Sequence, residues 1–129
     1  MAQHLFPLKI MAFDTDYGGI VHHASYLRFL EQGRTGWIQQ HDKTFLATQE
    51  NHDCFLVIKH CELSYHQPAR LYDDLDVITK AHYARPTALN FEQVIQHHDS
   101  QNVVLTATIM MVCVTRGMKP TRLPQQWQP

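Results

Sequence analysis

One amphipathic segment constrains the fold of this chain more than any other feature. Between residues 24 and about 40, apolar or small residues recur at helical spacing, at Tyr26, Phe29, Leu30, Gly33 and Trp37. This spacing places them on one face of a helix, while polar residues fill most of the other positions. Gly33 lies on the apolar stripe and weakens the helix by about 1 kcal/mol relative to Ala. We therefore expect the helix to pack against another layer and to approach it closely at Gly33.

The segments around this helix alternate with the period of two that is typical of strands. The predicted strands cover residues 5–13, 55–65, 74–83, 89–95 and 103–115. A chain ordered as one strand, one long helix and four strands joined by short turns favours an α+β fold, with an antiparallel sheet packed on the helix.

Three details refine this prediction. Pro7 indicates that the first strand lies at an edge of the sheet. Residues 103–115 are apolar on both faces, which is typical of an internal strand or of one at a subunit interface. We expect residues 1–129 to form a single domain, with 44–53 irregular apart from a short helical turn and 125–129 frayed.

Composition excludes several classes of protein. The 11 Lys and Arg residues nearly balance 12 Asp and Glu residues, so no basic surface for nucleic acid is expected. No signal peptide and no transmembrane segment are recognisable. The three cysteines form no Cys-x-x-Cys pair, and Cys54 and Cys61 should face opposite sides of a strand because they lie seven residues apart. These features favour a cytoplasmic protein.

The link between the first strand and the helix contains Asp14, Asp16, Gly18 and Gly19. Acids and glycines often form a simple turn. Two acids two residues apart also occur in calcium loops, but the other ligands of such a loop are missing. A third alternative is catalysis, since a helix N-terminus can polarise a carbonyl while a nearby carboxylate attacks it or activates water. A site that combines these two groups would be suited to acyl transfer.

Ten histidines are present, of which His23 at the predicted helix start is the strongest functional candidate. The adjacent His22 and His23 side chains should diverge, which makes them poor ligands for one metal ion. No spacing completes a zinc site, and we expect neither a metal nor a separate cofactor. No Gly-x-Ser-x-Gly motif is present, and the cysteines lie in or beside apolar strands where burial makes a thiol unreactive.

Three blocks of sequence resemble a known family. Asp14-Thr15-Asp16-x-Gly18-Gly19-Ile20-Val21-x-His23-Ala24-Ser25-Tyr26, followed by Phe29-x-Glu31-x-x-Arg34, is similar to the signature of hotdog-fold acyl-CoA thioesterases. The similarity is to the 4-hydroxybenzoyl-CoA thioesterase-like group, and within it to the Tol-Pal-associated (YbgC-type) subgroup. Further blocks at 62–77 and 112–124 agree with it. The resemblance implies a hotdog fold, in which a five-stranded antiparallel sheet wraps one long helix.

The resemblance also implies roles for single residues. Asp16 matches the catalytic carboxylate, as nucleophile or general base, and His23 the assisting histidine, whose backbone N–H donates to the thioester carbonyl. Residues implied at the substrate are Tyr17, Gly19, Val21, Tyr26 and Arg85. Arg85 would lie near the phosphates of CoA, Tyr17 could narrow the acyl site, and Tyr26 would line the acyl pocket or pack the helix. Glu31 and Arg34 are interpreted as solvated or interface residues of the helix.

The implied partners are an acyl-CoA substrate, which brings its own coenzyme A, and further copies of the chain in a homodimer or homotetramer. Acyl carrier protein is an additional candidate partner. Two rival functions remain: a hotdog hydratase or dehydratase, and a non-enzymatic module that binds acyl-CoA or acyl carrier protein. Asp16 together with His23 favours hydrolysis of a thioester.

Overall fold

The structure, a computed structural model, describes residues 3–129 and combines one curved sheet with one long helix. The helices are α1 (Ser25–His41) and α2 (Phe45–His52), and the 3₁₀ turns are η1 (Ala12–Asp14) and η2 (Gln125–Trp127). The strands are β1 (His4–Lys9), β2 (Phe55–Tyr65), β3 (Asp74–Arg85), β4 (Ala88–His97) and β5 (Val103–Val114). All neighbouring strands pair antiparallel, in the order β1-β3-β4-β5-β2.

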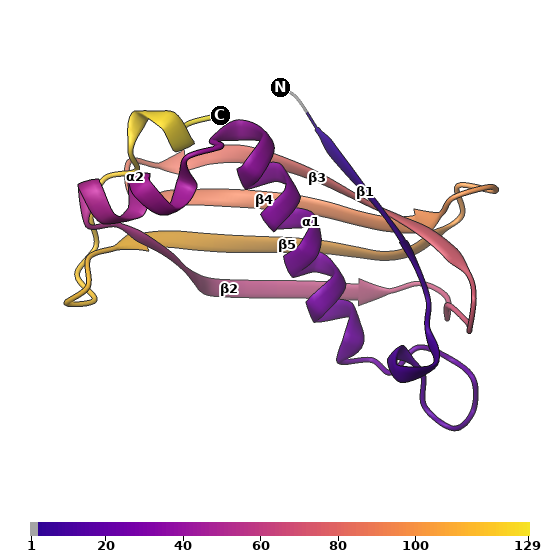
Figure 1. The fold of residues 1–129 in the computed structure, drawn as a ribbon. Coiled ribbons are helices and arrows are strands. Elements are labelled where there is room, and N and C mark those ends of the chain that lie inside the picture. Colours follow the sequence, from indigo (N-terminus) through magenta and orange to yellow (C-terminus); the bar gives the residue numbers. More distant parts are fainter. Residues whose placement is uncertain (1–2) are drawn as a thin grey trace.

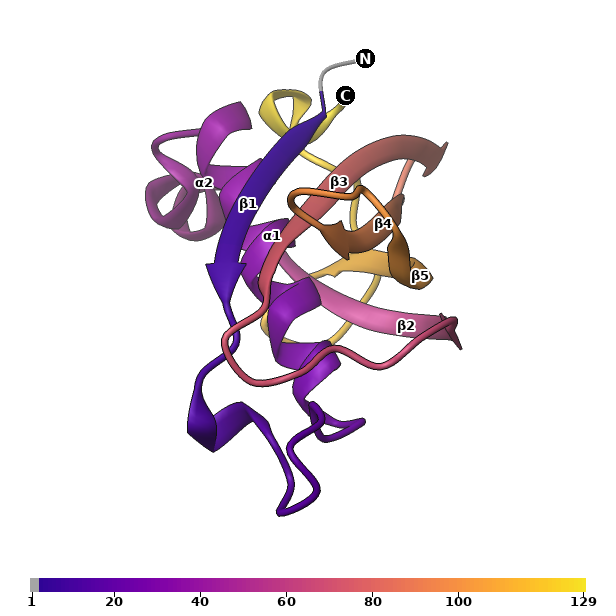
Figure 2. The ribbon, with the colours of Figure 1, turned by 90° about the vertical axis from the view of Figure 1, so that its right-hand side faces the viewer.

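Helix α1 crosses the sheet diagonally (Figure 1), and the sheet curls around it (Figure 2). The predicted hotdog arrangement is therefore confirmed. No helix within residues 3–129 has the length and apolar character needed to cross a lipid bilayer.

The apolar stripe of α1 packs on the sheet as predicted, because all five of its residues are buried. The helix approaches β3 closely at Gly33. A Cβ atom at this position would lie 2.6 Å from Cγ1 of Val77 and 2.8 Å from Oγ1 of Thr79. Only a residue without a side chain lets α1 lie this near to β3.

Arg34 departs from the prediction of a solvated or interface position, because it is buried within the chain. Its side chain is only 5 % exposed, and its Nη1 donates a hydrogen bond of 3.0 Å to Oε1 of Gln93. The Gln93 amide in turn donates to the carbonyl of Leu30 and to the hydroxyl of Thr79. Burial lowers the pKa of Arg34. Glu31 is exposed, as predicted.

The first strand is shorter than predicted. It ends at Lys9 rather than Phe13, because the Asp14 carboxylate accepts the backbone N–H of Met11 and closes η1. Strand β1 does lie at a sheet edge, as Pro7 indicated, and β5 is internal, between β4 and β2.

The prediction that Cys54 and Cys61 face opposite sides is wrong. A bulge between Ile58 and His60 inserts an extra residue into β2 and reverses the alternation beyond it. Cys61 therefore pairs with Ile109 on the side of the sheet that faces α1. All three cysteines are free.

Trp127, within the segment 125–129 that is predicted to fray, packs against the rest of the chain. Trp127 is 2 % exposed, and its indole N–H donates 2.9 Å to Oδ2 of Asp42. Its ring stacks on Phe45 of α2. Helix α2 occupies most of residues 44–53, where only a short helical turn was predicted. Asp42 also accepts hydrogen bonds from Thr44 and Thr48.

Replacing Gly33→Ala should lower the free energy of unfolding by about 1–3 kcal/mol, because the added methyl group clashes with β3 and forces the layers apart. Urea denaturation of the variant measures this loss. Gly117→Ala is the matched control, since its Cβ would meet nothing nearer than 3.7 Å. Equal stability of the two variants would contradict close packing at Gly33.

The Asp42 cluster should make stability depend on acid pH. Burial alone would raise the pKa of Asp42, but the hydrogen bonds from Thr44, Thr48 and Trp127 outweigh it and lower the pKa from 3.8 to about 2. A lowered pKa stabilises the fold above the unfolded value, and this contribution is lost as the pH falls toward 2. Wild type should exceed Asp42→Asn in free energy of unfolding at pH 6, and the difference should shrink at pH 2–3. A difference independent of pH would contradict this prediction.

Candidate active site

The predicted site lies on a small hairpin formed by residues 14–22, between β1 and α1. The backbone N–H of Asp16 donates to the carbonyl of Ile20 at 2.9 Å, and that of His22 donates to the carbonyl of Asp14 at 3.0 Å. The hairpin protrudes beyond one end of the sheet (Figure 1). Backbone hydrogen bonds between its two arms therefore give this segment its hairpin shape.

The second arm of the hairpin, which contains Gly19 and Val21, is anchored to the segment that follows β2. Val21 is buried, and its N–H donates to the carbonyl of Ala69 at 2.9 Å. Leu71 donates to the carbonyl of Gly19 at 3.3 Å. Gly19 has a φ of 79°, in the left-handed region that favours glycine. Of the predicted substrate residues, Gly19 and Val21 thus define the course of the backbone.

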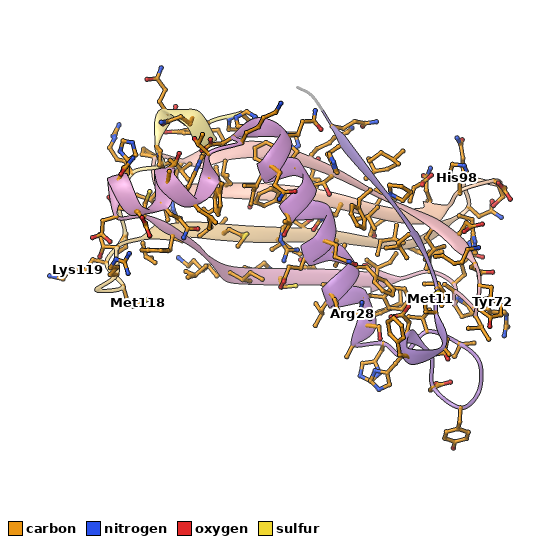
Figure 3. The ribbon with its side chains drawn as sticks, viewed as in Figure 1. Met11, Arg28, Tyr72, His98, Met118 and Lys119 are labelled. Atoms are coloured by element: carbon orange, nitrogen blue, oxygen red, sulfur yellow. The ribbon has the colours of Figure 1, made fainter. Side chains whose placement is uncertain are left out.

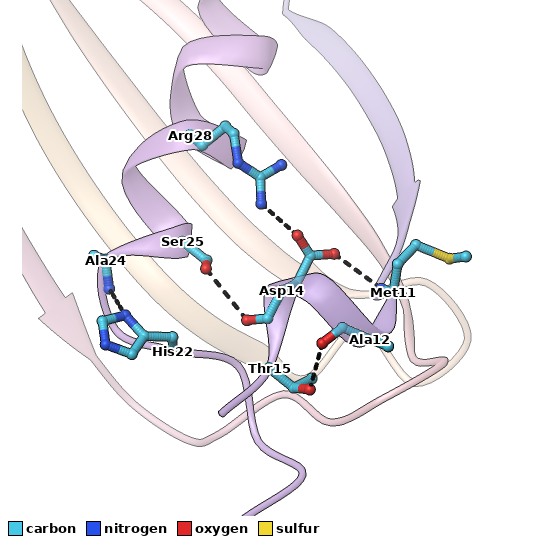
Figure 4. Close-up of polar contacts among 8 residues, drawn as sticks. All are labelled: Met11, Ala12, Asp14, Thr15, His22, Ala24, Ser25 and Arg28. Atoms are coloured by element: carbon cyan, nitrogen blue, oxygen red, sulfur yellow. Dashed lines mark hydrogen bonds and ion pairs between the residues drawn. The ribbon is translucent and has the colours of Figure 1, made fainter. Parts of the chain in front are cut away.

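Asp14 ties the hairpin to the helix. Its buried carboxylate accepts the N–H of Met11 at 2.9 Å and forms an ion pair with Arg28 of α1. Its carbonyl accepts the hydroxyl of Ser25 at 3.2 Å (Figure 4). Asp14 is therefore a structural residue. Sequence patterns gave no signal for Arg28, since its partner lies 14 residues away across a loop.

Asp16 lies near the tip of the hairpin and is exposed. Its Oδ1 accepts the N–H of Gly18 at 2.8 Å, which holds the carboxylate against its own loop. Within residues 3–129 no hydrogen bond joins the Asp16 carboxylate to His23 or to α1. The two predicted catalytic residues are therefore not hydrogen-bonded to each other within one chain. The second oxygen of the Asp16 carboxylate accepts no hydrogen bond within the described residues and is therefore open.

The start of α1 has an open donor. No side chain caps the helix at Ala24. In the described part of the chain, the backbone N–H of His23 makes no hydrogen bond. The carbonyl of His23 accepts the hydroxyl of Tyr65 at 3.2 Å, and the N–H of Ala24 donates to Nδ1 of His22 at 3.2 Å.

The rings of His22 and His23 do not diverge as predicted. They stack, with centroids 4.3 Å apart and an interplanar angle of 28°. The hydrogen bond from the backbone N–H of Ala24 holds the His22 ring (Figure 4), and in this position the ring stacks on His23, which explains the difference.

Two predicted substrate residues have contrasting surroundings. Tyr17 is fully exposed, so it narrows no pocket within one chain. Tyr26 is buried, and its hydroxyl accepts the N–H of Ala69 at 3.2 Å. Its ring meets Phe29 edge to face. Tyr26 therefore packs the helix, which is one of the two alternatives predicted for it.

Arg85 lies far from the hairpin within one chain. Strand β3 starts beside Lys9, near the hairpin, and ends at Arg85, which corresponds to about 35 Å at the usual rise per residue. Figure 3 shows Met11 toward one end of the sheet and Lys119 at the other. One chain therefore does not bring Arg85 and Asp16 together.

Tyr65 is a site residue that sequence reasoning missed. It belongs to the second matching block, but its contact with His23 spans 42 residues, and only the folded chain reveals it. The described residues contain no group of three His, Cys, Asp or Glu side chains placed to hold a metal ion.

Comparison with known proteins identifies the family. Residues 12–128 match the model of the thioesterase-like superfamily. The chain belongs to this superfamily. It is 37 % identical over 122 residues to the acyl-CoA thioester hydrolase YbgC of Escherichia coli O6:H1, covering 93 % of this chain and 89 % of that protein. It is 32 % identical to the acyl-CoA thioesterase YbgC of Haemophilus influenzae, covering 94 % and 88 %.

Solved structures agree with the sequence relatives. A probable thioesterase from Bartonella henselae superimposes with a TM-score of 0.85 at 30 % identity, covering 95 % of this chain and all of that one. A 1,4-dihydroxy-2-naphthoyl-CoA thioesterase from Synechocystis gives a TM-score of 0.89 at 20 % identity, covering 98 % and 93 %, which shows a shared fold.

Proposed function

We propose that this member of the superfamily hydrolyses the thioester of an acyl-CoA to a free acid and CoA. The observation that carries the proposal is the uncapped start of α1, where the N–H of His23 is open beside a hairpin that bears Asp16. Two relatives at 32–37 % identity are named acyl-CoA thioester hydrolase or thioesterase, which supports the same reaction.

In this mechanism the thioester oxygen accepts the N–H of His23. Negative charge develops on that oxygen when the carbonyl carbon is attacked, and the positive end of the α1 dipole stabilises it. The open oxygen of Asp16 removes a proton from water, the resulting hydroxide adds to the carbon, and the C–S bond breaks to release CoA thiolate. The His23 ring orients the attacking water.

A second route uses Asp16 as a nucleophile. Its carboxylate attacks the carbonyl, CoA leaves, and water hydrolyses the mixed anhydride. Label that appears in the Asp16 carboxylate after a single turnover in ¹⁸O-labelled water rules out the pure general-base route, because label enters this carboxylate only through an anhydride.

Both routes predict that Asp16→Ala and Asp16→Asn lower kcat by about 10²–10⁴-fold, the usual loss when an acid–base group is removed. The Asn variant keeps an acceptor for the N–H of Gly18 and so preserves the loop. Thiol release from acyl-CoA measures turnover. Asp99→Asn, on the exposed turn between β4 and β5, is the matched control. Undiminished turnover in both Asp16 variants would contradict the assignment.

The same assay distinguishes the rivals. A panel of acyl-CoAs of different chain length and aromaticity should release thiol with wild type. A hydratase would instead add water to enoyl-CoA without releasing thiol, and a binding module would retain acyl-CoA or acyl carrier protein without turnover. Binding of acyl carrier protein and a cytoplasmic location remain predictions from the sequence.

We also propose that the chain works as a homodimer joined along β2. This strand is the last in the sheet, so one edge of its 11 residues has no neighbouring strand within the described chain. Ile58 and Tyr65, on the α1 side of β2, are about half exposed. Antiparallel pairing of two β2 strands would bring the Phe55 end of one chain to the Tyr65 end of the other.

Such a dimer gives Arg85 a role. The Phe55 end of the sheet carries Arg85, Arg116 and Lys119, so these cations of one chain would approach the hairpin of the other and meet the phosphates of CoA. A pairing of this kind reconciles the predicted role of Arg85 with its distance from Asp16 in one chain.

Arg85→Ala should therefore raise KM for an acyl-CoA about tenfold, while KM for the matching acyl-pantetheine, which lacks phosphates, should not change. The expected factor follows from losing one charge-assisted hydrogen bond. Light scattering checks that the variant and wild type are dimers at micromolar concentration. A monomeric wild type, or an equal effect on both substrates, would contradict the prediction.

A further inference from the structure

The peptide group between His23 and Ala24 is held by side chains at both of its polar ends. Its carbonyl accepts the hydroxyl of Tyr65, and its N–H donates to Nδ1 of His22. We propose that Tyr65 is a positioning residue, which fixes this peptide and thereby aims the open N–H of His23 at the thioester carbonyl. The proposal rests on the proposed function.

Tyr65 can act as a rigid support because it belongs to the sheet rather than to the loop. It is the last residue of β2, where it pairs with Leu105 of β5. Its ring also meets the buried ring of Tyr26 edge to face, with centroids 5.6 Å apart. Tyr26 is fixed in turn by the N–H of Ala69. The Tyr65 hydroxyl therefore reaches the loop from a packed base.

His22 completes the arrangement from the other side. Its Nδ1 accepts the N–H of Ala24, so this nitrogen carries no proton. A peptide group is planar, and fixing its C=O and its N–H fixes the orientation of the whole unit. The N–H of His23 belongs to the preceding peptide group, whose carbonyl accepts the N–H of Ser25 at 2.9 Å. With the peptide groups on both sides of His23 held, its N–H has little freedom to turn. Since no side chain caps α1, these two contacts take the place of a cap.

This geometry predicts an effect on kcat rather than on KM. A donor aimed at the developing oxyanion contributes most in the transition state, whereas CoA and the acyl group bind through other contacts. A small misplacement of such a donor slows the chemical step by up to about 10²-fold.

Tyr65→Phe tests the proposal, because it removes one hydroxyl group and keeps the ring that meets Tyr26. We expect kcat for acyl-CoA to fall about 10–100-fold, while KM stays within about twofold. Tyr83→Phe is the matched control, since Tyr83 is also about half exposed and its hydroxyl makes no hydrogen bond within residues 3–129. It should leave both constants unchanged. His22→Phe, which keeps a ring to stack on His23, should also lower kcat.

Amide hydrogen exchange, followed by NMR, provides a readout that does not require activity. Exchange at Ala24, whose N–H is hydrogen-bonded to Nδ1 of His22, should become about fivefold faster in Tyr65→Phe, as expected when its peptide group loses one hydrogen bond, and should not change in Tyr83→Phe. Unchanged exchange in Tyr65→Phe would overturn the positioning role. A rise in KM at constant kcat would also overturn it, because Tyr65 would then contact the substrate directly. If wild type hydrolyses no thioester, the proposed function fails, and the exchange rates still decide the role of Tyr65.

Discussion

The close contact between α1 and β3 at Gly33 determines the arrangement of the rest of the molecule. Because no side chain separates the two elements, the larger residues of the stripe, such as Phe29 and Trp37, can fill the space on either side of the contact. The buried hydrogen bonds of Gln93 add direction to this packing, since they fit only one rotation of the helix about its axis. Apolar contact brings the helix to the sheet, and these polar contacts select its orientation.

The candidate site depends on that orientation because it lies at the N-terminus of the same helix. The Asp14–Arg28 ion pair joins the hairpin to the first turns of α1, and Val21 joins it to the segment after β2. A donor at the start of a 17-residue helix inherits the rigidity of the core, whereas the tip around Tyr17 and Asp16 remains exposed. Rigid donors and an accessible carboxylate are the combination that thioester hydrolysis requires.

Sequence patterns predicted what depends on neighbours in the chain. The stripe of α1, the five strands and the need for glycine at position 33 all follow from local spacing and sterics. Local contacts explain the early end of β1 and the stacked rings of His22 and His23. Other departures from prediction involve partners far apart in sequence. Arg34 bonds to Gln93 and Trp127 to Asp42, across 59 and 85 residues, and both are buried although spacing or terminal position suggested exposure. The hydrogen bond between Tyr65 and His23 likewise joins residues far apart in sequence, which local patterns do not reveal. A bulge in β2 likewise changed the face of Cys61, because one inserted residue reverses every position after it.

The hairpin illustrates why local chemistry alone could not settle the roles of its two acids. Asp14 and Asp16 lie two residues apart, and both fit a turn or a catalytic site. The folded chain separates them through burial: Asp14 is 3 % exposed and balanced by Arg28, while Asp16 is exposed and its carboxylate accepts a hydrogen bond from its own loop. A buried, paired carboxylate has no free oxygen to offer a substrate, and an exposed one with a single N–H partner does. The acid available for chemistry is thus the one that contributes least to the packing.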